Sequence, residues 1–409
     1  MSAVVDDLRD LVERGDATGV ARLVGSLGPS ERRVAARWLP TFLRDLRQRS
    51  SRGRLESHHQ MPLWLAGAGC LGGAAATARW LAHRDLVRHW VPEGRHVAEL
   101  SQILERRSRA WLVDVATRYA AGFRLRRHTW AVASALLRLG GVEPPGHDLL
   151  VVAWCAELER AGRDELRTDA FLSVMAPRVF RSEGVGAALA GDAAGHARRF
   201  ARLVDEGLLP RRSALTGCLG RFLRGGEARA MRFFTLLYRE LAPTVDEAAD
   251  HVVSFLRLLP SASEPVAELA AQELRRACDA GWLSGPELRE TFEALLFRQE
   301  RKIVHNALSW LDRAAGRPDG DEVLAALPVA FGRRDHEVAR HGVRIAARHA
   351  RRAGEHVRVQ LATAAMALPR ELRETLARSG LPTVRVGKPS LGGEECVEAG
   401  DRGAVRATN

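Results

Sequence analysis

The stretch GWLSGPELRETFEALLFRQERKIVHNALSWLDRAAG, residues 281–316, decides the fold. Its apolar residues recur with the period of an α-helix in two consecutive segments. Each of two groups shares one helical face: Leu288, Phe292, Leu295, Leu296 and Gln299 in the first segment, then Ile303, Ala307, Leu308 and Leu311 in the second. Neither segment is long enough to form a stable helix alone in water. The stretch therefore predicts two amphipathic helices that pack against neighbours.

The same pattern recurs at a regular spacing in the second half of the chain. The apolar anchors Val266, Ile303 and Val338 are 37 and 35 residues apart, and the segment 227–231 is a weaker copy upstream. Each anchor is followed four residues later by a small residue: Ala270, Ala307 and Gly342. Such spacing is typical of helical-hairpin arrays, whose neighbouring units cover one another's apolar faces. We expect an all-α chain, a right-handed α-solenoid of antiparallel helix pairs.

Longer motifs carry a resemblance to known proteins. They are AGAGCLGGAAATARWLAHRDL at 66–86, LVDEGLL at 203–209, ELAPTVDEAADHVVSFLRLLPS at 240–261 and ALLFRQERKIVHNALSWLDR at 294–313. Through them residues 1–370 resemble a domain-of-unknown-function family of G+C-rich bacteria, and the second half resembles HEAT/armadillo helical repeats. The resemblance implies a fold and brings no activity with it.

Turn signals and composition divide the chain into three regions. The cluster GGVEPPG at 140–146 marks the strongest turn of the first half. We expect an irregular helical region at 1–140, a HEAT-like repeat region at 141–380 and a disordered tail at 381–409. The tail is rich in glycine and lacks apolar periodicity.

The charge balance leaves two interpretations open. The net charge is +12, and Lys302 and Lys388 are the only lysines, so nearly all of the positive charge comes from arginine. A G+C-rich genome produces such a bias through codon usage, whereas an anionic partner would select for it.

Cysteine usage and hydropathy indicate where the chain resides. The five cysteines are spread out with no CxxC pair, which fits a reducing, cytoplasmic setting. The longest uncharged run, 61–78, is interrupted by Pro62 and several glycines, so we expect a buried helix there and no membrane partner.

Two motifs resemble ligand sites but lack the context that each site requires. Residues 67–72 read G-x-G-x-x-G, with Asp85 at 18 residues from Gly67, yet no strand precedes the glycines as a dinucleotide site requires. We interpret them as a close-packed helix. His336 and His341 lie at i, i+5, which places their side chains about 140° apart around a helix, too far for a shared metal.

The best candidate site is a basic stripe in the second half. We expect Arg340, Arg344, Arg348 and Arg352 to share one helical face, because they recur at i+4. Like charges at this spacing repel, and an anion along the stripe would offset the repulsion. Arg301 and Lys302 on the preceding helix complete the candidate anion site. The alternative is a solvated outer face of an arginine-rich protein.

The leading hypothesis is a non-enzymatic scaffold that mediates protein–protein interaction through an extended surface. It assigns no catalytic residue, no cofactor and no metal ligand. The alternative is a nucleic-acid-binding helical repeat, like those that recognise damaged DNA, using the arginine-rich face. In that class a tryptophan and a carboxylate project from the concave face, and Trp310 with Asp312 is the candidate pair.

Overall fold

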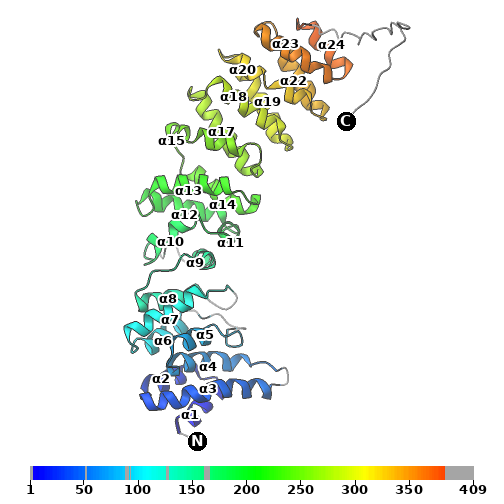
Figure 1. Ribbon diagram of the computed structural model, residues 1–409. Coiled ribbons are helices and arrows are strands. Elements are labelled where there is room, and N and C mark those ends of the chain that lie inside the picture. The colour runs from blue at the N-terminus through cyan, green and yellow to red at the C-terminus, as the bar shows by residue number, and fades with distance from the viewer. Residues whose placement is uncertain are drawn as a thin grey trace, which may run out of the picture. The chain divides into compact units, whose positions relative to one another are not determined.

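The computed structural model describes residues 3–50, 53–87, 92, 94–125, 129–160 and 166–382 (Figure 1). Every regular element in these ranges is a helix, and none of them contains a β-strand. The predicted all-α class is confirmed. The predicted tail lies outside the described residues from position 383 on. The helices form two compact units, Met1–Leu283 and Ser284–Asn409, and the predicted boundary after residue 140 falls within the first.

The first unit contains helices α1 to α17. Its N-terminal part consists of α1 (Ala3–Glu13), α2 (Ala17–Ser26), α3 (Pro29–Arg49), α4 (Ser57–Cys70), α5 (Ala74–Leu81), α6 (Arg95–Leu104), α7 (Arg109–Ala121) and α8 (Trp130–Gly140). It continues with α9 (Asp148–Arg160), α10 (Leu172–Arg178), α11 (Val185–Ala188), α12 (Ala193–Asp205), α13 (Arg211–Arg224), α14 (Ala228–Glu240), α15 (Val245–Ala249), α16 (Val252–Leu258) and α17 (Glu264–Asp279).

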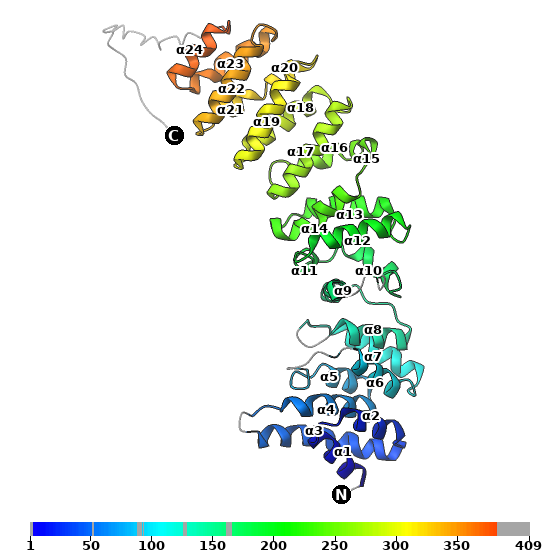
Figure 2. The same ribbon diagram turned by 180° about the vertical axis from the view of Figure 1, so that it is seen from behind.

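The second unit has shorter connections between its helices. It consists of α18 (Gly285–Phe297), α19 (Arg301–Ala314), α20 (Gly320–Leu324), α21 (Leu327–Phe331), α22 (His336–His349), α23 (Glu355–Ala364), the 3-10 turn η1 (Ala365–Ala367) and α24 (Arg370–Arg378). Helix α18 packs against α19, and α21 packs against α22. Within this unit α19, α22 and α24 lie in one row and α18, α21 and α23 in another, seen from both sides in Figure 1 and Figure 2.

Six helices, here called the B helices, begin at nearly constant intervals. They are α12, α14 and α17 in the first unit and α19, α22 and α24 in the second, and they start 34 to 37 residues apart. Within each unit, successive B helices pack against one another. Within each unit, the regular interval therefore brings one B helix over the apolar face of the next.

The predicted anchors and small residues are buried as expected. Val266, Ile303 and Val338 occupy the third position of α17, α19 and α22, and Ala270, Ala307 and Gly342 occupy the seventh. A Cβ atom on Gly342 would lie 3.1 Å from Ala330 in α21. A small side chain at this position therefore lets the two helices of a pair approach closely.

The glycines of the G-x-G-x-x-G motif serve the same purpose in α4. Gly67 and Gly69 lie in the buried C-terminal part of this helix, residues 62–70, with no strand before them. A Cβ atom on Gly67 would lie 2.1 Å from the Trp80 indole nitrogen, and one on Gly69 would lie 2.0 Å from Val24. Asp85 forms an ion pair with Arg47 at 3.2 Å. The motif is thus a packing device between α4, α5 and α2.

Arginines connect segments that lie about one helix pair apart in the sequence. Guanidinium groups bond to carbonyl or carboxylate groups 33 to 44 residues away, as in Arg178 to Pro145, Arg199 to Leu158, Arg211 to Glu247, Arg224 to Phe180, Arg276 to Pro243 and Arg333 to Phe297. Much of the positive charge is therefore used inside the fold, which neither sequence interpretation anticipated.

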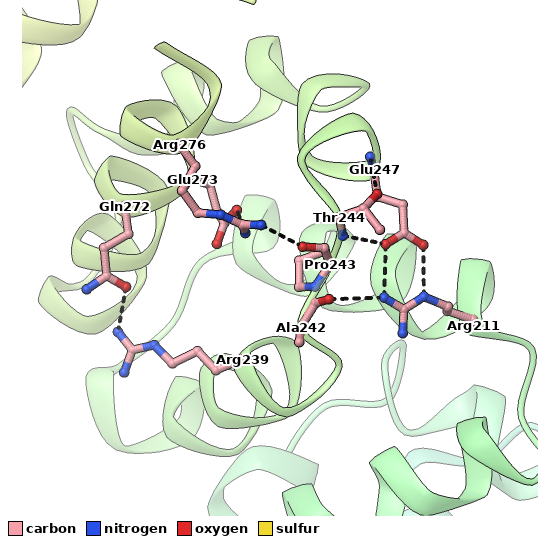
Figure 3. A network of polar contacts seen from close by, with 9 residues as sticks. All are labelled: Arg211, Arg239, Ala242, Pro243, Thr244, Glu247, Gln272, Glu273 and Arg276. Carbon is pink, nitrogen blue, oxygen red and sulfur yellow. Dashed lines mark hydrogen bonds and ion pairs between the residues drawn. The ribbon is translucent and has the colours of Figure 1, made fainter. Parts of the chain in front are cut away.

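Figure 3 shows how two of these arginines hold the turn after α14. Arg211 bonds both carboxylate oxygens of Glu247, at 2.8 and 2.9 Å, and reaches the carbonyl of Ala242. Arg276 donates to the carbonyl of Pro243 at 2.9 Å. Ala242 adopts a left-handed φ of 43°, an unfavourable conformation for alanine. Contacts from both sides therefore stabilise a strained turn.

The motif glycines give a direct test of the packing. We expect Gly67→Ala and Gly69→Ala each to lower the free energy of unfolding by about 1–3 kcal/mol, because the added methyl group overlaps Trp80 or Val24. Gly72→Ala is the matched control within the same motif, since its Cβ would meet no atom within 4 Å. Chemical denaturation of the three variants measures the difference. Equal stability of all three would contradict the packing role.

The turn network predicts an acid-dependent loss of stability. The Arg211 guanidinium lowers the pKa of Glu247 from 4.5 to about 2, so this carboxylate stabilises the fold fully above pH 4.5 and less as the pH falls towards 2. Glu247→Gln should therefore reduce stability by about 1 kcal/mol at pH 7, with a smaller reduction at pH 3, measured by thermal unfolding.

Glu273 is the matched control for this prediction. Burial raises its pKa, so its ionised form at neutral pH costs stability rather than adding to it. Glu273→Gln should leave the melting temperature at pH 7 unchanged or raise it. Two results would contradict the stabilising role of ionised Glu247. One is a loss of stability in Glu273→Gln as large as that in Glu247→Gln. The other is a loss in Glu247→Gln that is as large at pH 3 as at pH 7.

Candidate functional site

The predicted basic residues lie on two adjacent B helices of the second unit. Arg301 and Lys302 open α19, and Arg340, Arg344 and Arg348 follow the exposed face of α22. Both helices bury one face with the same periodicity, so the charged positions between the buried ones are exposed to solvent. The structure thus brings five of the six predicted anion-site residues onto one pair of packed helices.

The prediction that Arg352 continues the stripe is wrong. Helix α22 ends at His349, and the backbone amide of Arg352 closes a turn by donating to the carbonyl of His349 at 2.9 Å. Residues beyond the end of a helix no longer follow its i+4 periodicity. The connection ends at Gly354, the residue before α23, whose amide donates to the Asp321 carboxylate. Arg340, Arg344 and Arg348 alone form the helical stripe.

Most of the stripe is already neutralised by carboxylates. Arg301 pairs with Asp335 at 3.1 Å, Arg340 pairs with Glu337 at 3.2 Å, and Arg348 pairs with Asp312. Arg344 is exposed and has no ion pair in the described part of the chain. The surface therefore carries less free positive charge than the sequence suggests, which weakens its attraction for a polyanion.

Two histidines lie between the helices beside this stripe. The rings of His305 and His341 are 6.5 Å apart between centroids. Burial, with Arg344 and His305 nearby, lowers the pKa of His341, so its ring is neutral at pH 7. His349 is buried and lies 3.0 Å from Asp312 through Nε2. The carboxylate of Asp312 thus holds both His349 and Arg348 to α19.

The candidate pair for base recognition is engaged inside the fold. Trp310 is only 6% exposed and packs edge-on against Phe292, with ring centroids 4.7 Å apart. Asp312 is occupied by Arg348 and His349. Neither side chain projects freely from the surface, so this pair does not form the arrangement expected of a damaged-DNA reader.

A groove that sequence reasoning missed lies at one end of the same helices. Its cavity volume is about 630 Å³, between the end of α18, the start of α19, α21 and the start of α22. The apolar part of its lining is Phe297, Val304, Pro328, Val329 and Val338. Its charged part consists of Arg301, Arg333 and Arg334 with the single acid Asp335.

Phe297 is the most unusual residue of this groove. Its side chain is 69% exposed at the last position of α18, outside the buried face formed by Leu288, Phe292, Leu295 and Leu296. Arg333 donates to the carbonyl of Phe297 at 2.9 Å, which fixes the end of the helix. A large aromatic off the apolar stripe was the sequence signal for this groove, and only the fold shows which arginines surround it.

His336 and His341 belong to no group of three metal-ligand atoms among the described residues. In the described residues, three donor atoms within 4.8 Å of one another occur only at Glu56, His58 and His59, where α4 begins. Burial and the neighbouring His58 lower the pKa of His59, which favours the neutral ligand form. Three such donors can hold a divalent cation with its other positions open. The sequence signal for this group is two adjacent histidines, His58 and His59.

The described cysteines have the properties of core residues. Cys70, Cys155, Cys218 and Cys278 are buried free thiols. Burial raises the pKa of Cys70 to about 12 and raises the pKa of Cys155 and Cys218 as well. A thiol must ionise to act as a nucleophile, so these side chains contribute packing rather than reactivity.

Neither the helices nor known proteins point to a function for this chain. Within the described residues, every helix is too short or too polar to cross a bilayer. No family model, no curated protein and no solved structure matches the chain. The predicted membership of a family from G+C-rich bacteria therefore stays a prediction, and a function has to be inferred from the chain's own residues.

Proposed function

We propose that the chain is a HEAT/armadillo-like scaffold that binds an acidic, extended segment of a partner protein in the groove around Phe297. The observation that carries this proposal is an exposed aromatic side chain surrounded by arginines on a rigid pair of helix ends. Binding needs no chemical step, in agreement with the non-enzymatic function that the sequence predicts.

The regular B helices support the scaffold part of the proposal. Their constant intervals and shared buried positions are typical of α-solenoids, in which antiparallel helix pairs stack with a right-handed progression. Such stacks present the connections between helices as long, rigid binding surfaces. The groove forms where two connections lie close together, the one between α18 and α19 and the one between α21 and α22.

The lining of the groove determines the chemistry of the partner. An exposed Phe297 beside Val304, Pro328 and Val329 is suited to one apolar side chain of a peptide. Arg334 is exposed and has no ion pair in the described residues, so it is available to a carboxylate. An apolar residue flanked by Asp or Glu fits both features, whereas a basic peptide would be repelled.

Protein binding is favoured over nucleic-acid binding by the state of the arginine stripe. Arg301, Arg340 and Arg348 are paired with acids, and Trp310 is buried. A nucleic-acid surface requires free positive charge and exposed platforms for base stacking. The reducing, cytoplasmic setting inferred from the cysteines is part of the same proposal.

Peptide display against the full-length chain tests the proposal. We expect enriched peptides to contain one Leu or Phe flanked by acidic residues. A labelled peptide of this type should bind about tenfold more weakly to Phe297→Ala and to Arg334→Glu, measured by fluorescence anisotropy. Val359→Ala and Arg313→Glu are matched controls, because they remove an exposed apolar side chain and reverse an exposed charge outside the groove.

Two outcomes would contradict the proposal. Enrichment of basic peptides, or equal weakening by the control variants, would show that the groove does not select the partner. Binding of DNA or RNA that falls steeply with salt and is abolished by Arg344→Glu with Arg348→Glu would establish the nucleic-acid alternative instead.

A further inference from the structure

A second cavity, in the first unit, is lined by arginines without any acidic residue. It has a volume of about 770 Å³ and lies between the start of α3, the end of α4 and the turn from α6 to α7. Five arginines line it and no carboxylate does: Arg32, Arg33, Arg37, Arg106 and Arg107. Elsewhere, arginines such as Arg211 and Arg221 are paired with Glu247 and Glu183.

Backbone carbonyls, which carry no net charge, hold these guanidinium groups in place. Arg106 donates to the carbonyl of Gly25 at 2.7 Å, and Arg107 donates to those of Leu71, at 3.0 Å, and Gly69. Arg32 donates to the carbonyl of Val24 at 3.4 Å. Hydrogen bonds to carbonyl groups orient a guanidinium without neutralising its charge. The cluster is therefore preorganised and positively charged.

Two buried donors in the cluster lack a partner within the described residues. They are the Nε atoms of Arg32 and Arg107. Burial is the main cause that lowers the pKa of Arg107, and the nearby charge of Arg32 lowers it further. The Cys70 thiol supplies no negative charge, because its pKa is raised to about 12. Glu31, the acid on the same turn of α3, accepts instead from the amide of Gly28 at 2.7 Å.

The surrounding helices add to the positive potential. Helices α3 and α7 both begin at the cavity, at Pro29 and after Ser108, and the N-terminal ends of helices favour anions. At the C-terminal end of α4, where the helix dipole is negative, Arg107 covers the carbonyls of Gly69 and Leu71. The two helix N-termini raise the affinity of the cavity for negative charge, and Arg107 offsets the opposing effect of the end of α4.

Trp111 gives the cavity a fixed apolar wall. Its indole nitrogen donates to the carbonyl of Gly72 at 2.7 Å, and the Arg107 guanidinium stacks over its ring at 4.8 Å from the centroid. Such anchoring prevents the ring from collapsing into the cavity. A wall of this kind suits the organic part of a small ligand better than a bare inorganic ion.

We propose that this cavity binds a small organic molecule that carries two or more linked phosphate groups. Arginine forks match phosphate oxygens in pairs, and several arginines around one space favour a chain of phosphates over a single one. The volume lies in the range of small-molecule sites, roughly 300–1,000 Å³. This site is independent of the groove at Phe297, so either proposal can fail without the other.

Isothermal titration calorimetry with the full-length chain tests this proposal. The probes are ATP, tripolyphosphate and inorganic phosphate at physiological ionic strength. We expect ATP to bind with a stoichiometry of one and more tightly than tripolyphosphate, and inorganic phosphate to bind at least about tenfold more weakly than both. Adenosine, which carries no phosphate, should not bind.

Variants on the exposed side of α3 locate the site without disturbing the fold. Arg33→Gln with Arg37→Gln should weaken ATP binding by about tenfold or more, because both side chains are exposed and line the cavity. Arg22→Gln with Arg44→Gln is the matched control: it removes the same charge from exposed positions of α2 and α3 outside the cavity. Circular dichroism establishes that each variant is folded.

Three results would overturn the proposal. Equal weakening by both double variants would show general charge attraction rather than a site. Equal affinity for phosphate and tripolyphosphate would remove the preference for linked phosphates. Displacement of ATP by single-stranded nucleic acid at equal nucleotide concentration would assign the arginines to a nucleic-acid surface instead.

Discussion

The structure depends on the cover that successive helix pairs give to one another. A helix of about fourteen residues gains too little from its own hydrogen bonds to persist alone in water. Within each unit, each B helix therefore buries one apolar face against the next, and Val266, Ile303 and Val338 occupy equivalent positions of α17, α19 and α22. Small residues one turn later allow the backbones to approach. The need to bury one apolar face sets the interval between the helices. It also limits charged residues to the face that remains exposed.

Arginine strengthens the same stack from its edges. A guanidinium has five donors and a long apolar stem, so it can span two helix pairs and bond a carbonyl or a carboxylate on the far side. Arg276 and Arg333 do so through Pro243 and Phe297. The arginine-rich composition thus has a structural use, beside the genomic and functional explanations that the composition suggests. Function has to be sought where arginines remain without such a partner.

The two proposed sites differ in the way they use unpaired arginine. At Phe297 the positive charge lies beside an exposed apolar side chain, so charge and burial act together on a peptide. At the α3 cavity five arginines line one space without an acid, and burial and the charge of Arg32 lower the pKa of Arg107. The predicted stripe on α22 has neither property, because Arg340 and Arg348 already bond Glu337 and Asp312.

The sequence by itself determined the helical class, the spacing of the anchors and the packing role of the small residues. These features follow from the period of an α-helix and from side-chain size, which are local properties. Only the tertiary structure decided that Arg352 leaves the stripe, that Trp310 is buried, and that arginines from α3 and from the turn after α6 line one cavity. The cavity depends on side chains about 70 residues apart meeting in space, and the burial of Trp310 depends on its contact with Phe292 of the neighbouring helix. The period of a single helix encodes neither contact, nor does it fix the residue at which α22 ends.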